Sequence, residues 1–160
     1  MTRRLARFAA ATGLGLLAAI AIAPVTANPM ADLSGRWSGN GSIASAGGSV
    51  EQMRCVATYF QKRVDTLQQN LRCASPSYKI ETTADLLVRG AFVVGQWQEK
   101  IHGRTGQVSG RLTEKGFSLA IMGDSFSAAL DLTTSACKQS IDIKPRGLEI
   151  SRISIGLGKC

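Results

Sequence analysis

The chain has 160 residues, with 19 lysines and arginines, 11 acidic residues and one histidine, which give a net charge of +8. Three of the arginines lie within the first seven residues, so residues 28–160 carry 16 basic residues and a net charge of +5. In that region the basic residues stand singly except for Lys62-Arg63, so no basic stripe is present that would follow a phosphate backbone. This pattern argues against a nucleic-acid-binding protein.

The first 27 residues are typical of a secretory signal peptide. The early arginines precede an apolar run over residues 8–24, and Val25-Thr26-Ala27 follows as a small-residue cleavage site. Glycine, threonine and proline interrupt the run, which is shorter than the roughly 20 apolar residues that a spanning helix needs. We expect cleavage after Ala27, no transmembrane span after removal of this leader (residues 1–27), and a periplasmic or secreted protein. Residues 28–160 are long enough for a single domain with one core.

The cysteines predict disulfides rather than a metal site. All four follow the leader, at Cys55, Cys73, Cys137 and Cys160. An even number in an exported chain indicates two disulfides, for which three connectivities are open. No pair has Cys-x-x-Cys spacing and His102 stands alone, so we expect no metal and no cofactor.

The first predicted strand covers residues 33–43, and the segment that follows it fits two structures. Over residues 50–73, apolar residues spaced three and four apart describe a helix stripe, whereas an alternating pattern predicts a hairpin that turns near residues 62–65. Residues 18 apart on a helix lie about 27 Å apart, beyond the reach of a disulfide. A hairpin would place Cys55 opposite Cys73, so we favour the hairpin, and a bond between these two would confirm it. The pairing of Cys137 with Cys160 stays open.

The remaining segments also predict strands. Residues 91–97 are apolar on both faces, which indicates a strand covered on both sides or facing a closed interior. Residues 103–116 contain four glycines and predict a mobile hairpin region. Residues 117–132 form the clearest hairpin, with a turn at Gly123-Asp124. Within residues 148–157 the apolar residues change from even-numbered to odd-numbered positions. One extra residue would keep all of them on the same face, which predicts a β-bulge near Ser151 or Arg152.

Together these segments predict an all-β fold. We expect an antiparallel meander of about 8 to 10 strands that closes into an up-and-down barrel. Closure would remove the two open edges of the sheet, which are sites of aggregation. A barrel of about eight strands has an interior just wide enough for side chains or one small ligand.

One short motif suggests a family. Gly35-Arg36-Trp37 resembles the G-x-W signature of lipocalins and related calycin barrels. In that family the tryptophan closes the bottom of an eight-stranded barrel, and a basic residue near the end of the chain packs across it. Arg152 would be the matching residue. The chain has no T-D-Y motif and no helical segment after the last strand. The strings MRCVATY and LRCASPSY are also similar to small exported bacterial proteins of unassigned function.

The sequence contains no motif that points to catalysis. A nucleophile with its base, a carboxylate pair or a metal set would be needed, and the acidic residues are spread singly along the strands. His102 lies in a glycine-flanked turn, which is typical of an exposed loop histidine. We therefore expect a non-enzymatic protein.

Two binding functions remain. The first is a carrier for a small apolar or amphipathic ligand, such as a lipid, in the barrel interior. Its expected wall residues are Trp37, Phe92, Val94, Trp97, Phe117, Leu119, Phe126 and Leu130. The second is an envelope protein-binding or inhibitor-like module whose contact surface is the glycine-rich segment 103–116.

Overall fold

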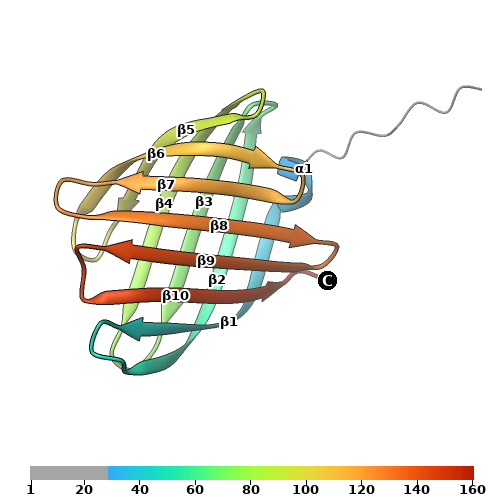
Figure 1. Ribbon diagram of the computed structural model, residues 1–160. Helices are drawn as coiled ribbons and strands as arrows, with labels where there is room; N and C mark the ends of the chain where they lie inside the picture. The colour runs from blue at the N-terminus through green and yellow to red at the C-terminus, as the bar shows by residue number, and fades with distance from the viewer. Residues whose placement is uncertain (1–28) are drawn as a thin grey trace, which may run out of the picture.

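The computed structural model describes residues 29–160, so the predicted signal peptide over residues 1–27 lies outside the described part of the chain. Ten antiparallel strands form one closed barrel, and a short helix precedes them (Figure 1). The elements are α1 (Pro29–Leu33), β1 (Gly35–Ser45), β2 (Val50–Arg63), β3 (Thr66–Ala74), β4 (Lys79–Arg89), β5 (Phe92–Glu99), β6 (Arg104–Thr113), β7 (Gly116–Met122), β8 (Ser127–Ser135), β9 (Lys138–Arg146) and β10 (Ile150–Gly158). The predicted all-β barrel is confirmed, with the strand count at the upper end of the expected range.

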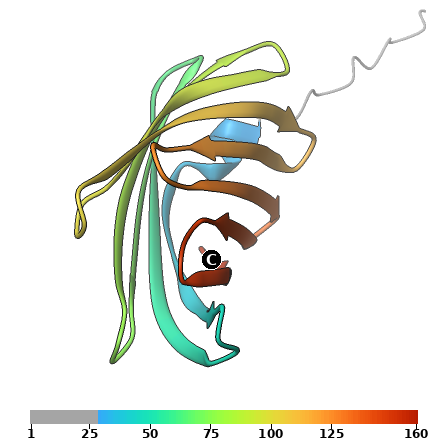
Figure 2. The same ribbon diagram turned by 60° about the vertical axis from the view of Figure 1, so that its left-hand side comes forward.

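Each strand pairs with the next along the chain, and β1 pairs with β10 to complete the ring. In this closing pair Gly41 lies opposite Ile155 and Ile43 lies opposite Ile153. Figure 2, a view turned from that of Figure 1, shows the last strands beside β1. Because side chains alternate between the two faces of a strand, one face of every strand lines the interior and the other faces solvent. No strand of the barrel is left with an unpaired edge.

Residues 50–73 form the predicted hairpin, and the helical alternative is wrong. In the register between β2 and β3, Cys55 lies opposite Cys73, and a disulfide joins them with a Cα–Cα distance of 4.1 Å. The second disulfide joins Cys137, in the β8–β9 turn, to Cys160 at the end of the chain. Both links therefore hold neighbouring parts of the barrel together.

Two predictions about the middle of the chain hold in part. In β5, Val93 is 1% exposed, whereas Phe92 and Val94 are 63% and 48% exposed, so this strand faces the closed interior on one side and is not covered on the other. The predicted hairpin region, residues 103–116, contains strand β6, which pairs antiparallel with β5 on one side and β7 on the other. Two of its glycines lie within β6, since glycine is common in turns but also occurs where strands bend.

Glycines on the inner faces of β5 and β6 permit this curvature. A Cβ atom added at Gly95 would lie 2.1 Å from the carbonyl oxygen of Asp85, and one added at Gly110 would lie 2.2 Å from that of Ser118. Only glycine allows neighbouring backbones to approach so closely, and such kinks help a sheet to close into a barrel. The predicted bulge is confirmed, since Ala44 pairs with Arg152 and Ser45 with Ile150, which leaves Ser151 as the extra residue.

Helix α1 closes one end of the barrel together with Trp37 of β1. Leu33 and Trp37 are both fully buried, and the Trp37 Nε1–H group donates to the Leu33 carbonyl oxygen at 2.7 Å. The basic residue that covers the tryptophan is Lys159, whose Nζ atom lies 4.8 Å from the centre of the ring. The expected partner, Arg152, instead pairs with Asp142 on the outer surface at 2.8 Å. Lys159 has this role because the last strand ends beside the first.

Candidate functional site

The half of the barrel away from α1 contains a cavity of about 510 Å³. At the closed end, large side chains such as Trp37 and Phe117 fill the interior and are almost completely buried. Towards the open end, Ala84, Ala128 and Thr82 occupy inward-facing positions and line the cavity. A ten-stranded barrel is wider than an eight-stranded one, and small side chains at these positions do not fill its interior. The cavity is of the size that proteins use for small ligands.

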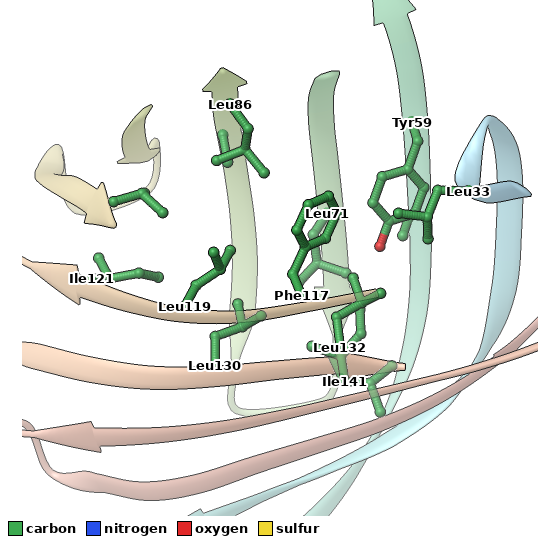
Figure 3. Close-up of a cluster of buried hydrophobic side chains, with 14 of the residues drawn as sticks. Leu33, Tyr59, Leu71, Leu86, Phe117, Leu119, Ile121, Leu130, Leu132 and Ile141 are labelled. Carbon is green, nitrogen blue, oxygen red and sulfur yellow. The ribbon is translucent and has the colours of Figure 1, made fainter. Parts of the chain in front are cut away.

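The wall of the cavity is mainly apolar. Figure 3 shows Leu71 and Leu86 extending into the interior, towards Leu119 and Leu130 on β7 and β8. The large apolar lining residues include Leu71, Ile80, Leu86, Trp97, Val108, Leu119, Ile121, Phe126, Leu130, Ile143, Ile153 and Ile155. Near the opening, the rings of Trp97 and Phe126 meet edge to face, with centroids 5.5 Å apart. The cavity therefore offers an apolar environment with an aromatic pair near its mouth.

The eight residues predicted from sequence as the ligand wall fall into three groups. Trp97, Leu119, Phe126 and Leu130 line the cavity. Trp37 and Phe117 are buried in the packed end of the barrel and do not line it. Phe92 and Val94 lie on the outer surface, where Arg111 stacks over the Phe92 ring at 5.7 Å. The error at β5 is one of phase, because Trp97 cannot share a face with Phe92 and Val94 in a regular strand.

A carboxylate at the mouth holds the β5–β6 turn. Glu99 accepts hydrogen bonds from the backbone N–H groups of Ile101 at 2.8 Å and His102 at 2.7 Å, and His102 Nδ1 lies 3.1 Å from the same carboxylate. Burial alone would raise the pKa of Glu99, but these N–H donors outweigh it and lower the pKa below its ordinary value. Glu99 is therefore ionised at neutral pH, and its carboxylate is engaged by its own turn.

Arg104 and Lys79 both border the mouth, and neither makes an ion pair within the described residues 29–160. Arg104 belongs to the inward-facing set of β6, whereas Lys79 belongs to the outward-facing set of β4. Glu149, in the β9–β10 loop, also lines the mouth. In the order of strands around the ring, this loop lies four strands away from the β5–β6 turn, on nearly the opposite side. On the β5–β6 side, the Arg104 guanidinium and the Glu99 carboxylate thus lie opposite each other without forming an ion pair.

A polar cluster lies beneath the cavity. Gln69 lines its floor and donates from Nε2 to the Tyr59 hydroxyl at 3.0 Å, which in turn donates to Gln139 Oε1 at 2.8 Å. Burial raises the pKa of Tyr59, so its hydroxyl remains protonated and can act as both donor and acceptor. This arrangement satisfies two buried amides and places one of them at the bottom of the cavity.

Reasoning from the sequence missed most of the polar residues at the site. Arg104 was assigned to a loop, although its separation from Val108 by four residues puts both on the same face once the segment is read as a strand. Gln69 shares the inward-facing set of β3 with Cys73, but nothing in the sequence signalled a cavity above it. Within residues 29–160, no group of histidine, cysteine and acidic residues is arranged to hold a metal ion. No helix in that part of the chain is long and apolar enough to cross a membrane.

Comparisons with known proteins return a likeness of fold. No protein-family model matches the chain, and no curated protein matches it. Among solved structures, it is similar to a redesigned β-barrel, with 12% sequence identity and a TM-score of 0.46. The match covers 82% of this chain and 95% of the redesigned barrel.

Proposed function

We propose that this protein is an exported, non-enzymatic carrier that holds one small apolar or amphipathic ligand inside its barrel. The observation that carries the proposal is the cavity of about 510 Å³, with its mainly apolar wall, in a barrel whose other end is fully packed. Each methylene group moved from water into such a wall contributes about 0.8 kcal/mol. The resemblance of Gly35-Arg36-Trp37 to the calycin signature is in keeping with a ligand-holding barrel.

Export is the second part of the proposal. The leader pattern over residues 1–27 supports it, and the two disulfides are compatible with the oxidising conditions of a periplasm or an extracellular space. The Glu99 carboxylate at the mouth is already engaged by the backbone N–H groups of its own turn, which favours binding over catalysis there. The contact surface expected for a protein-binding module is a wall strand, β6, so we favour the carrier.

The test is a native mass spectrum of the protein recovered from its host without reducing agent, followed by a denaturing spectrum. A reproducible extra mass that disappears on denaturation is expected if the cavity carries a ligand. The mass of the polypeptide also reports whether the chain begins at Asn28, as the predicted cleavage site requires.

A pair of variants links binding to the cavity. Ala128 lines the cavity, whereas its neighbour Ala129 is exposed on the outer face of the same strand. Ala128→Phe should abolish the extra mass and the uptake of a neutral apolar dye such as N-phenyl-1-naphthylamine, while Ala129→Phe should leave both unchanged. A wild-type protein that carries no ligand and takes up no dye would refute the carrier function.

A further inference from the structure

We infer that Arg104 anchors the anionic head of a single-chain amphiphile at the mouth of the cavity, with the apolar tail inside the barrel. This inference rests on the proposed carrier function and specifies the class of ligand. It depends on the position of Arg104, on the absence of an acidic partner for it within the described residues, and on the size and polarity of the space below it.

Arg104 is the first residue of β6 and belongs to the inward-facing set of that strand. In the β5–β6 register it lies opposite Glu99, which lines the cavity, and two residues before Gly106, which lies opposite Trp97. Since residues opposite one another share a face of the sheet, Arg104 is directed to the inner side of the rim. A guanidinium is not needed there for packing, because the residue is exposed.

The neighbouring carboxylate does not form an ion pair with Arg104. Glu99 would be its natural partner across the strand pair, yet the backbone N–H groups of Ile101 and His102 and the His102 ring occupy the Glu99 oxygens. No ion pair involving Arg104 forms within residues 29–160. Its five N–H donors are therefore available for a carboxylate or a phosphate group, which a guanidinium binds through two parallel hydrogen bonds.

Arg104 is a cation of the inner rim that an anionic head can reach without displacing an ion pair of the described chain. Lys79, at the start of β4, also borders the opening but belongs to the outward-facing set of that strand. Of the two acidic lining residues, Glu99 lies opposite Arg104 and is held by its own turn, and Glu149 lies on nearly the opposite side of the ring. A negatively charged head is therefore attracted to the Arg104 guanidinium itself rather than to a broad basic patch.

The space below Arg104 suits a single hydrocarbon chain. A methylene group is close in size to a water molecule, which occupies about 30 Å³ in the liquid. A chain of about twelve carbons therefore needs roughly 360 Å³, which fits within the cavity of about 510 Å³. Trp97 lines the cavity near its mouth, so its fluorescence should report the arrival of a tail.

The test compares three ligands that share a twelve-carbon chain and differ in the head: dodecanoate, 1-dodecanol and dodecyltrimethylammonium. Each is titrated below its micelle concentration into delipidated protein, and the tryptophan fluorescence is followed; Trp37, in the packed end, contributes a second signal besides that of Trp97. The variant is Arg104→Gln. The matched control is Arg111→Gln, because Arg111 lies on the same strand but on the outer face, over the Phe92 ring.

We expect the wild-type protein to bind dodecanoate more tightly than dodecanol, and dodecyltrimethylammonium least. Arg104→Gln should weaken dodecanoate about tenfold, the scale of one charge-assisted contact at a partly solvated site, and leave dodecanol unchanged. Arg111→Gln should bind all three ligands like the wild type, and a denaturation midpoint confirms that each variant is folded.

Two results would overturn the assignment of Arg104 while leaving the carrier function intact. In the first, dodecanoate binds Arg104→Gln as tightly as the wild type. In the second, Arg104→Gln and Arg111→Gln weaken dodecanoate equally, which would show a general effect of surface charge. If neither dodecanoate nor dodecanol binds the wild-type protein, the carrier function itself fails, and the head-group assignment fails with it.

Discussion

Replacement of Trp37 by alanine should remove the plug that closes the packed end of the barrel. The ring is fully buried, its N–H group donates to the Leu33 carbonyl oxygen at 2.7 Å, and the Lys159 ammonium lies 4.8 Å from the ring centre. Lys159 also donates to the carbonyl oxygens of Asp32 and Ser34, at 2.8 and 3.2 Å, so the same contact ties the last strand to helix α1. The substitution therefore disturbs both ends of the chain at once.

We expect Trp37→Ala to lower the free energy of unfolding by about 3–5 kcal/mol, the usual cost of emptying a buried aromatic site. The upper part of this range is favoured, because the loss includes a hydrogen bond worth about 1 kcal/mol. It also includes a cation–π contact worth about 0.5–1 kcal/mol. Trp37→Phe keeps most of the ring and should cost about 1–2 kcal/mol. Lys159→Met keeps the apolar stem and should cost no more than about 1 kcal/mol.

The measurement is equilibrium unfolding in guanidinium chloride with both disulfides intact, followed by circular dichroism, because the tryptophan fluorescence comes from Trp37 and Trp97 in the wild type but from Trp97 alone in the Trp37 variants. Free energies of unfolding are compared between variants only where the slope of the free energy against denaturant concentration is the same. A change in that slope would mean that the surface exposed on unfolding has changed. A loss below about 1 kcal/mol for Trp37→Ala would refute the plug and show that the ring contributes little to closure.

Three further variants probe other contacts. Tyr59→Phe leaves two buried amides without their shared partner and should cost about 1–3 kcal/mol, measured by chemical denaturation; an unchanged stability would mean that water replaces the hydroxyl. Replacing both Cys137 and Cys160 by serine frees the last strand and should cost about 2–4 kcal/mol, whereas an unchanged midpoint would deny the link a stabilising role. Because the pKa of Glu99 is lowered in the folded state, its stabilising effect is present above the ordinary value of 4.5 and is lost as the pH falls below it. Glu99→Gln should therefore make the acid-induced loss of stability less steep, and an identical pH profile would contradict this role.

The strands were predictable where the pattern is local. Residues 117–132 alternate cleanly and are joined by a short turn, so β7 and β8 followed from the sequence. Residues 50–73 carried both a helical and an alternating pattern, and the reach of a disulfide decided between them. The bulge at Ser151 was visible because a change of apolar phase within one strand needs an extra residue to keep one face inside.

The phase of β5 and the inward face of β6 were not predictable in the same way. Phe92 and Val94 are apolar but exposed, so apolar character alone did not reveal which face of β5 is buried. In β6 the inward-facing positions include Gly106 and Gly110, which show no hydrophobic signal. Their place inside the barrel is set by pairing with β5 and β7, and a single segment does not contain that information.

The sequence by itself predicted a meander of short antiparallel strands and favoured a hairpin that sets Cys55 opposite Cys73. These features depend on neighbours along the chain and on the alternation of side chains. Only the tertiary structure decided that Lys159 rather than Arg152 covers Trp37, that a cavity remains at one end, and that Arg104 stands at its mouth without an acidic partner in the described chain. The physical reason is closure. The pairing of β1 with β10 and the register around the whole ring bring together residues far apart in sequence, and the space inside is what their side chains leave unfilled.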